Sequence, residues 1–428
     1  RHRELLSYGR HIVLSIERFI RVPKLILWKA VNTPAFRYRE FRFLWIASLF
    51  NSVGFVGEQV VLGWVALELS GSPFIVGTVL ALRMAPFFFL GLPAGAVADR
   101  VDRRLLMTIS SIGMAVLGAL VGGLIFLNII SIWHLMVLTV MGGSIRAINN
   151  PARQSFVFDV VGLKHLVSGL ALVSLSMRLG GIVGSISVGL LIGRFGADAA
   201  YVLLAVAYLC SAITVQMIQS RGQSAPTVNQ TLWENMKGLV RELRGNSTLL
   251  MVLLLAGAVE ILGFSHQALL PTLANDVFNV GPEGLGLMNG LRSLGGIVGI
   301  AVLSIIGDVR RKGLMYLIVL HGFGVSLIFL GVASTFHMAV VAIILINGMG
   351  TLSDILSQSL VQTAVANDLR GRAMGSWVVA VGMGPIGHVQ IGALASFLTV
   401  TFALVTHGAG LLILGIISVS FFPRFRRL

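Results

Sequence analysis

The sequence predicts an all-α membrane protein with twelve transmembrane helices in two pseudo-symmetric six-helix bundles. Hydrophobic residues make up 56% of the 428 residues and charged residues only 11%, which excludes an ordinary soluble protein. Apolar runs follow one another along nearly the whole chain, each close to the roughly 20 residues that cross a bilayer core as a helix. Polar residues inside these runs recur about 208 positions later, which indicates two homologous halves.

The apolar runs predict the crossings in order. Helices are the expected form, because lipid leaves no backbone group unpaired and the alternating pattern of β-strands is absent. In the first half we expect helices at 42–69, 74–98, 103–127, 131–151, 166–193 and 197–218. In the second half we expect them at 248–275, 284–307, 313–331, 334–358, 370–398 and 400–422.

The distribution of basic residues predicts the topology. A net charge of +15 could indicate a nucleic-acid partner, but Lys and Arg gather at both termini and in alternate loops, while the other loops hold almost none except Arg194. This is the positive-inside pattern of a protein in a lipid bilayer. We therefore expect no nucleic acid, and a multi-pass protein of the bacterial cytoplasmic (inner) membrane with both termini cytoplasmic. The single cysteine, Cys210, excludes a disulfide within the chain.

Composition shifts divide the chain into four segments. Residues 1–33 are basic and amphipathic, typical of an interfacial helix on an anionic membrane surface; a disordered basic tail is the alternative. They are too charged for a cleavable signal peptide. The expected N-terminal bundle is 34–218, the polar segment 219–247 is a cytoplasmic linker, and 248–428 is the C-terminal bundle with a short basic tail.

Four pairs of polar residues support the duplication. Each pair lies inside or beside apolar sequence at nearly the same offset, and one such match alone could be chance. The pairs are Gln154 with Gln362, Asp159 with Asn367, Arg83 with Arg292, and Arg146 with Asp354. Homologous halves of this kind place their binding site at the interface between them.

A short charged loop follows the second apolar run. It reads Gly95-Ala96-Val97-Ala98-Asp99-Arg100-Val101-Asp102-Arg103-Arg104, and Ser304-Ile305-Ile306-Gly307-Asp308-Val309-Arg310-Arg311 echoes it in the second half. The loop resembles the signature of the major facilitator superfamily. The resemblance implies a conformational latch formed by Gly95, Asp99, Arg100, Arg103 and Arg104, with Asp99 facing the start of the eleventh helix and the arginines pairing with acids of neighbouring loops. The alternative is a loop whose charges serve topology alone.

Three further segments resemble the efflux branch of this superfamily, which includes enterobactin-type siderophore exporters and macrolide exporters. They are Leu82-Arg83-Met84-Ala85-Pro86, Asn150-Pro151-Ala152-Arg153-Gln154 and Leu369-Arg370-Gly371-Arg372. The resemblance runs from about residue 36 to 422, which is a length that fits two related six-helix bundles.

Acidic residues buried in a membrane are costly, so each is a functional candidate. Glu58 near the middle of the first helix and Glu260 in the seventh are the candidate proton-coupling residues, because a carboxylate in a dry cavity can take up and release a proton as access alternates. The alternatives are structural pairs, Glu58 with Arg83, and Glu260 with Arg178 or Arg292.

The remaining polar residues within the spans are candidates for a substrate cavity. Depth along each helix places Arg83, Arg178 and Arg292 near the midplane, and Arg146 and Asp354 toward the cytoplasmic mouth. The arginines could bind an anionic substrate or neutralise the acids, and the histidines could be packing residues. The full predicted set is Asn51, Arg83, Arg178, His266, Gln267, Arg292, Asp354 and His388.

These observations lead to an expected function. The resemblance implies a secondary active transporter that exports an organic solute, drug-like or siderophore-like, by proton antiport with alternating access. We expect a monomer whose partners are a small organic solute and protons, with no cofactor and no metal, and no catalytic constellation indicates an enzyme. The alternatives are a lysolipid or lipid translocator, an uptake carrier of the same fold, or a non-transporting membrane sensor or scaffold.

Overall fold

The computed structural model describes residues 34–220, 222, 246–307, 311–365 and 370–421. Side chains are described throughout these ranges except at 91–100, 370–372 and 421. The expected amphipathic segment 1–33 and most of the expected linker 219–247 lie outside the described residues. The described backbone is almost entirely helical, as the composition predicts.

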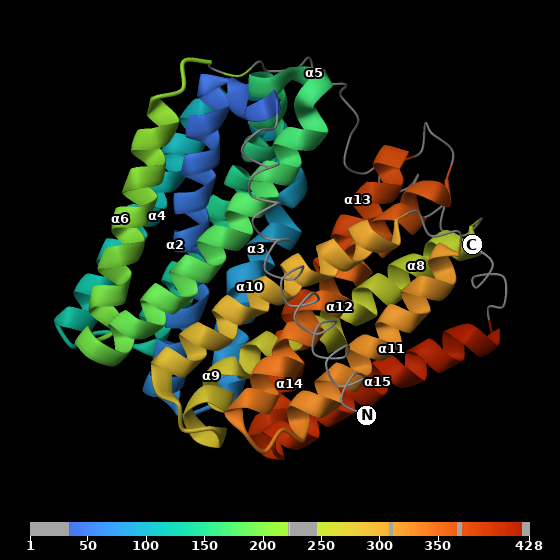
Figure 1. Cartoon of the computed structure of the whole chain (residues 1–428). Helices are drawn as coiled ribbons and strands as arrows, with labels where there is room; N and C mark the ends of the chain where they lie inside the picture. The colour runs from blue at the N-terminus through green and yellow to red at the C-terminus, as the bar shows by residue number, and fades with distance from the viewer. Residues whose placement is uncertain (1–33, 221, 223–245, 308–310, 366–369, 422–428) are drawn as a thin grey trace, which may run out of the picture.

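The first half, drawn in blue to green in Figure 1, is a bundle of long helices. Its boundaries follow from local chemistry. The Asp102 carboxylate accepts hydrogen bonds from the backbone N–H groups of Arg104 and Leu105 and caps a helix start, and Gly71 ends another helix in the left-handed conformation with φ 60°. The elements are η1 (Pro34–Arg37), α2 (Arg39–Ser70), α3 (Pro73–Arg100), α4 (Arg103–Phe126), α5 (Ile132–Phe195) and α6 (Ala197–Gln216).

Helix α5 contains two crossings joined without a loop. It has 64 residues, and a straight helix of that length would measure about 96 Å, roughly three bilayer cores. Gly162 breaks it with φ 68° and ψ 174°, a conformation that only glycine adopts readily. Eleven spans long and apolar enough to cross a membrane occur in the described residues, and this double helix is one of them. The predicted twelve crossings are therefore confirmed.

The second half, yellow to red in Figure 1, contains two interrupted crossings. The helices expected to be continuous at 248–275 and 370–398 both change geometry: the first leaves the α-helical form at Val259 and contains Pro271 further on, and the second breaks just before Pro385, which lacks a backbone N–H. The seventh crossing consists of α8 (Ser247–Ala258), η2 (Val259–Gly263), η3 (Phe264–Leu269), α9 (Leu270–Thr272) and η4 (Leu273–Val277), and the eleventh of α13 (Arg370–Val381) and α14 (Gly384–Phe397). The others are α10 (Gly281–Ile306), α11 (Lys312–Gly331), α12 (Phe336–Thr363) and α15 (Val400–Phe421).

Two glycines of α5 let α2 pack closely against it. A Cβ atom at Gly180 would lie 2.5 Å from the carbonyl oxygen of Leu49, and one at Gly184 would lie 2.5 Å from that of Val53. Close backbone approach at small residues is a common basis of helix association in lipid. The contact fixes α2, the helix that carries Glu58, against the core of the first half.

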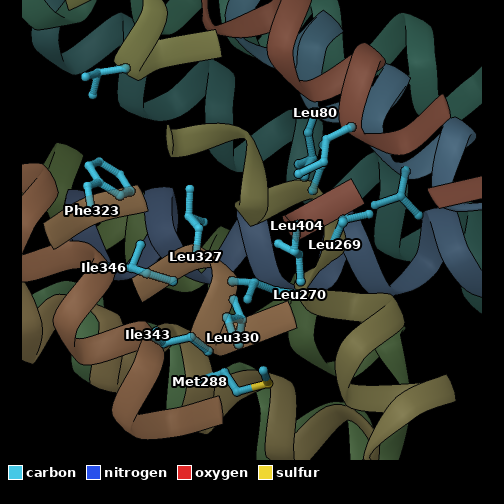
Figure 2. Close-up of a cluster of buried hydrophobic side chains, with 14 of the residues drawn as sticks. Leu80, Leu269, Leu270, Met288, Phe323, Leu327, Leu330, Ile343, Ile346 and Leu404 are labelled. Atoms are coloured by element: carbon cyan, nitrogen blue, oxygen red, sulfur yellow. The ribbon is translucent and has the colours of Figure 1, made fainter. Parts of the chain in front are cut away.

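A buried apolar core fills the second half and reaches the first. Figure 2 shows Phe323 and Leu327 of α11 in the same region as Ile346 of α12. Leu80 of α3 and Leu269 of η3 belong to the same buried cluster. The apolar core is therefore continuous across the contact between the two halves.

The molecule has two ends that the loops define. At one end α6 ends at Gln216 and α8 begins at Ser247, and we call this the linker end. At the opposite end α3 begins at Pro73 and α15 begins at Val400, and we call this the far end. Alternating helix directions place residues 101–102 and the end of α12 at the linker end, and the 127–131 and 332–335 connections at the far end.

The two halves are joined by hydrogen bonds at the far end. The Oγ atom of Ser396 in α14 accepts a hydrogen bond from the backbone N–H of Phe74 at 2.9 Å and lies 3.4 Å from the Oγ atom of Ser72. Nearby, α5 and α10 approach so closely that a Cβ atom at Gly286 would lie 2.9 Å from the Cα atom of Gly189. The described structure is thus closed between the halves at this end.

Candidate functional site

Helix α2 directs three polar or aromatic side chains toward the interior of the first half. Asn51, Phe55 and Glu58 are spaced four and three residues apart, so they share one helix face. Asn51 and Phe55 line a cavity of about 110 Å³. Its other lining residues are Ser52, Phe87, Met114, Ile145, Arg146, Asn149, Asn150, Arg153, Met177 and Tyr208. Glu58 lies one turn further along, beside a smaller cavity that shares Met114 and Tyr208 with the first.

Glu58 forms an ion pair with Arg146 of α5. Both residues are buried, with exposed fractions of 9% and 7%, and the Tyr208 hydroxyl lies 3.5 Å from a Glu58 carboxylate oxygen. The structure gives Glu58 this partner instead of Arg83. The expected depth of Arg146, toward the cytoplasmic mouth, stays a prediction. Depth along a helix does not determine which neighbouring helix a side chain faces.

Arg83 of α3 stacks on the same aromatic ring as Arg146. Its Nη2 atom donates a hydrogen bond to the carbonyl oxygen of Phe55 at 2.6 Å, and its guanidinium carbon lies 4.3 Å from the centre of the Phe55 ring. The guanidinium carbon of Arg146 lies 5.3 Å from the same centre. A ring face stabilises a cation without neutralising its charge. Two buried cations therefore share Phe55 beside a single carboxylate, that of Glu58.

Arg153 adds a third cation to this region. Its Nη1 atom donates to the Asn51 side-chain oxygen at 2.9 Å, and its Nη2 atom donates to that of Asn150 at 3.3 Å. The basic-residue pattern assigned Arg153 to a loop, but α5 continues through Pro151 and buries it against the cavity. The predicted end of the fourth helix at 151 was therefore too early.

An amide pair joins the two halves in the middle of the molecule. The Nε2 atom of Gln59 in α2 donates to the Oε1 atom of Gln267 in η3 at 2.9 Å, across 208 positions. Arg292 of α10 donates through Nη2 to the Oε1 atom of Gln59 at 3.1 Å. Since 208 is also the offset of the repeat, the two glutamines are equivalent positions of the halves, and the pseudo-two-fold axis passes between them.

The buried acids of the second half lie near Arg178. Arg178 of α5 donates through Nη2 to the Thr351 hydroxyl of α12 at 3.3 Å, and Asp354, one turn along, is near enough to attract its charge. Glu260 is buried in η2, within electrostatic range of Asp354. Among the described residues, Glu260 makes no ion pair with either Arg178 or Arg292.

The predicted histidines are held by backbone carbonyls. The Nδ1 atom of His266 donates to the Gly263 carbonyl at 2.7 Å, and that of His388 donates to the Gly384 carbonyl at 2.9 Å. Both are fully or almost fully buried. Sequence reasoning missed His407, whose Nδ1 atom lies 2.9 Å from the Ser265 hydroxyl. This contact fixes α15 against the interrupted seventh crossing.

The predicted latch residues divide into two groups. Gly95, Asp99 and Arg100 lie in α3, and their side chains lie outside the described part of the structure. The Nη1 atom of Arg103 donates to both carboxylate oxygens of Asp159 in α5, at 2.9 and 2.7 Å. Arg104 donates through Nη2 to the Gln216 side chain of α6 at 2.8 Å. These contacts tie the loop to helices of the first half at the linker end.

Several residues of this region could not be identified from the sequence. Tyr208 has no polar spacing that distinguishes it from an apolar-core tyrosine, and Asn149 lies within a polar run that suggested a helix end. Arg146 did carry a signal, the repeat match with Asp354, but its pairing with Glu58 could not be deduced from that match. The structure brings Asn51, Glu58 and Arg83 into the first-half cluster and Gln267 and Arg292 to the axis.

Comparisons with known proteins agree along most of the chain. Residues 31–426 match the family described as transmembrane secretion effectors. The staphyloferrin A transporter of Staphylococcus aureus is 22% identical over 335 residues, covering 77% of this chain and 83% of that protein. The enterobactin exporter EntS of Shigella flexneri is 24% identical over 399 residues, covering 92% of this chain and 93% of that protein.

Solved transporter structures share the fold. A bacterial homologue of the human lysosomal transporter Spinster, in an inward-facing and unoccupied conformation, superposes with a TM-score of 0.72 at 14% identity, covering 92% of this chain and 99% of that one. A POT family transporter in complex with a thioalcohol-conjugated peptide gives a TM-score of 0.75 at 11% identity, covering 90% and 96%. At these identities the likeness concerns the fold alone. With a family match over nearly its whole length, the chain belongs to the transmembrane secretion effectors of the major facilitator superfamily.

Proposed function

We propose that this transporter exports an organic solute of the siderophore type from the cytoplasm by proton antiport, with access alternating between the linker end and the far end. Its relatives named above are a staphyloferrin A transporter and an enterobactin exporter. The basic loops at the linker end support a cytoplasmic location for that end. The fold supplies two homologous halves with polar residues between them, as transporters with alternating access have.

The observation that carries this proposal is the buried ion pair of Glu58 and Arg146 beside the cavity. A carboxylate that pairs with a cation in a low-dielectric site holds that cation strongly, and protonation of the carboxylate removes most of the attraction. A proton arriving at Glu58 from outside therefore releases Arg146. A proton leaving Glu58 restores the pair, so the charge of the cavity follows the proton gradient.

Glu260 is the second proton-carrying residue in this proposal. It is buried close to Asp354 on the other side of the pseudo-axis, and proximity of two acids favours a shared proton. The two sites then differ in chemistry: Glu58 exchanges its proton against a bound cation, whereas Glu260 exchanges it against a neighbouring acid. Glu58 is the primary candidate because its partner lines the cavity.

The far-end closure is suited to reversible opening. The described hydrogen bonds between the halves there are made by neutral serine and backbone groups. Each such bond contributes only about 1 kcal/mol net, so a few of them can be broken by the binding energy of a solute or a proton. We therefore propose that this contact opens when the solute is released outward.

Everted membrane vesicles from a strain that lacks its own exporters test the proposal. Energised vesicles with the protein should accumulate staphyloferrin A or enterobactin, and a proton uncoupler should abolish the accumulation. Vesicles with the Glu58→Gln variant provide the matched control. Accumulation that survives the uncoupler contradicts proton antiport, and uptake by intact cells in place of export indicates a carrier of the opposite direction.

A further inference from the structure

The charged side chains of the first half do not balance. Arg83, Arg146 and Arg153 are 5%, 7% and 6% exposed, and all three lie at or next to the cavity. Among the described residues the carboxylate that pairs with this group is that of Glu58, which holds Arg146. Arg83 and Arg153 donate only to neutral oxygens, those of Phe55 and of two asparagines. The cluster therefore carries two more positive than negative charges.

Several donors of this cluster have no acceptor in the described structure. They are the Nε atom of Arg83 and the Nε and Nη1 atoms of Arg146, all inaccessible to solvent, although the Arg146 guanidinium lies within reach of the neutral Tyr208 hydroxyl. A buried cation that lacks both a counter-charge and acceptors is costly, and a purely structural arginine normally has both. Because Arg146 lines the cavity, its free donors and the excess charge point to a ligand that brings acceptors and negative charge.

The surroundings of Arg178 in α5 differ from this cluster. Arg178 donates to the Thr351 hydroxyl and lies near enough to Asp354 for mutual attraction. Arg178 therefore has an acid of the second half beside it, whereas Arg83 and Arg153 donate to neutral oxygens.

We infer that the cluster of Arg83, Arg146 and Arg153 is an oxyanion site that binds a carboxylate of the transported solute. The inference rests on the proposed export function for its cargo. Guanidinium groups pair with carboxylates through parallel hydrogen bonds, and Arg146 and Arg153 both line the cavity that such an anion would enter.

The neutral lining extends the description of the ligand. Asn149 and Asn150 place amide groups at the same cavity, and Phe55 and Phe87 place aromatic rings there. Amides suit hydroxyl or amide groups, and ring faces suit flat organic segments. The site therefore favours an organic polycarboxylate over a small inorganic anion.

Binding of citrate to the purified protein in nanodiscs, measured by isothermal titration calorimetry, tests the site. Triethyl citrate is the neutral control, and inorganic phosphate is the test of a small oxyanion. We expect citrate to bind more tightly than either. Arg146→Gln and Arg153→Gln should each weaken citrate binding by roughly 10- to 100-fold, because each removes a charge-assisted hydrogen-bond donor. Arg194→Gln, at an exposed arginine at the far end of α5, should leave it unchanged.

Should Arg146→Gln fail to fold by size-exclusion chromatography, Arg146→Lys takes its place, since it retains the charge and loses the fork geometry.

The outcomes separate the site from the export function. The site is overturned if citrate does not bind, or if its binding is unchanged in the arginine variants. It is also overturned if triethyl citrate binds as tightly as citrate or if phosphate binds more tightly. Citrate binding that follows the variants as expected supports it, even if the everted vesicles show no gradient-driven accumulation, in which case the export proposal alone falls. If the vesicles show gradient-driven accumulation but substitution of Arg146 or Arg153 does not change citrate binding, the export proposal is retained and the site is rejected.

Discussion

At the residue scale, the pair of Glu58 and Arg146 concentrates the chemistry of the first half. Removing one partner of a buried ion pair costs about 3–5 kcal/mol, because the other charge stays buried without compensation. Protonation of Glu58 removes the same charge while every atom stays in place. The pair can therefore act as a switch in the wild-type protein, whereas most substitutions at Arg146 change folding as well.

We predict that Glu58→Gln abolishes gradient-driven export while solute exchange at equilibrium continues. Glutamine retains the size and hydrogen-bonding capacity of the neutral carboxylic acid but cannot release a proton. Export should fall to the uncoupled background, measured as accumulation in everted vesicles under an imposed pH gradient. Counterflow of labelled solute in the same vesicles is the control for folding. Export with an unchanged dependence on external pH would place the proton elsewhere, with Glu260→Gln as the next variant to measure.

The sequence identified much of this residue set but not its contacts. Membrane-buried charge singled out Glu58, Arg83 and Arg292 because burial of an ionisable group in lipid needs a reason. The partner of Glu58 could not be deduced, because it depends on how α2 and α5 are rotated toward each other. That rotation is set by glycine packing at positions such as Gly184, where many rotations are compatible with the same sequence spacing.

At the element scale, Arg103 and Asp159 tie the start of α4 to the linker-end part of α5. The side chains are 7% and 8% exposed, and the guanidinium donates to both carboxylate oxygens. This pair belongs to the loop that resembles the superfamily signature. It fixes the first half as one body at the end where the halves are expected to separate and meet again during transport.

We predict that Asp159→Asn lowers the thermal stability of the protein, by about 2 kcal/mol or more, because Arg103 loses its charged partner in a buried site. Fluorescence-detected size exclusion after heating measures the change in Tm. Arg104→Gln, which removes only a hydrogen bond to Gln216 at an exposed side chain, is the matched control and should have a small effect. Combining Asp159→Asn with Arg103→Gln should destabilise less than the two single variants together. Full additivity would show that the pair contributes no coupling.

The interrupted crossings mark the limit of prediction at this scale. Hydropathy predicted the spans at 248–275 and 370–398 because their composition is apolar throughout. It could not predict that the first changes to π-helical and 3-10 geometry and that the second breaks near Gly384. Pro271 and Pro385 indicate such positions, but a proline within a transmembrane helix is often accommodated by a bend. The merged helix α5 was not predicted either, because Gly162 lies between two apolar runs as a loop residue would.

At the scale of the whole molecule, the charge distribution predicts which end faces the cytoplasm. In a Cys210→Ser background, a cysteine at Ser334 in the far-end connection should react with an impermeant maleimide in intact cells, because its side chain is exposed there. A cysteine at Ser224 in the linker should react only after permeabilisation. The reverse pattern would invert the topology and with it the proposed direction of transport.

The repeat is also visible at this scale in the hydrogen bond between Gln59 and Gln267. Equivalent residues of two homologous halves contact each other only near the pseudo-two-fold axis, so this amide pair lies at the centre of the contact between the halves. On the far-end side of this point the halves are joined through Ser72 and Ser396. A rotation that opens the far end must separate those two serines.

We predict that a disulfide between Ser72→Cys and Ser396→Cys stops transport reversibly. The two Oγ atoms are 3.4 Å apart, so cysteine sulfurs at these positions need only a small shift to reach the bonding distance of about 2.05 Å. In the Cys210→Ser background an oxidant should form the crosslink, seen as a mobility shift after a cut introduced in the linker. Gradient-driven export should then cease and return on reduction, while each single-cysteine variant continues to transport under oxidant. Undiminished export by fully crosslinked protein would mean that the halves need not separate at the far end, and alternating access by this rotation would have to be abandoned.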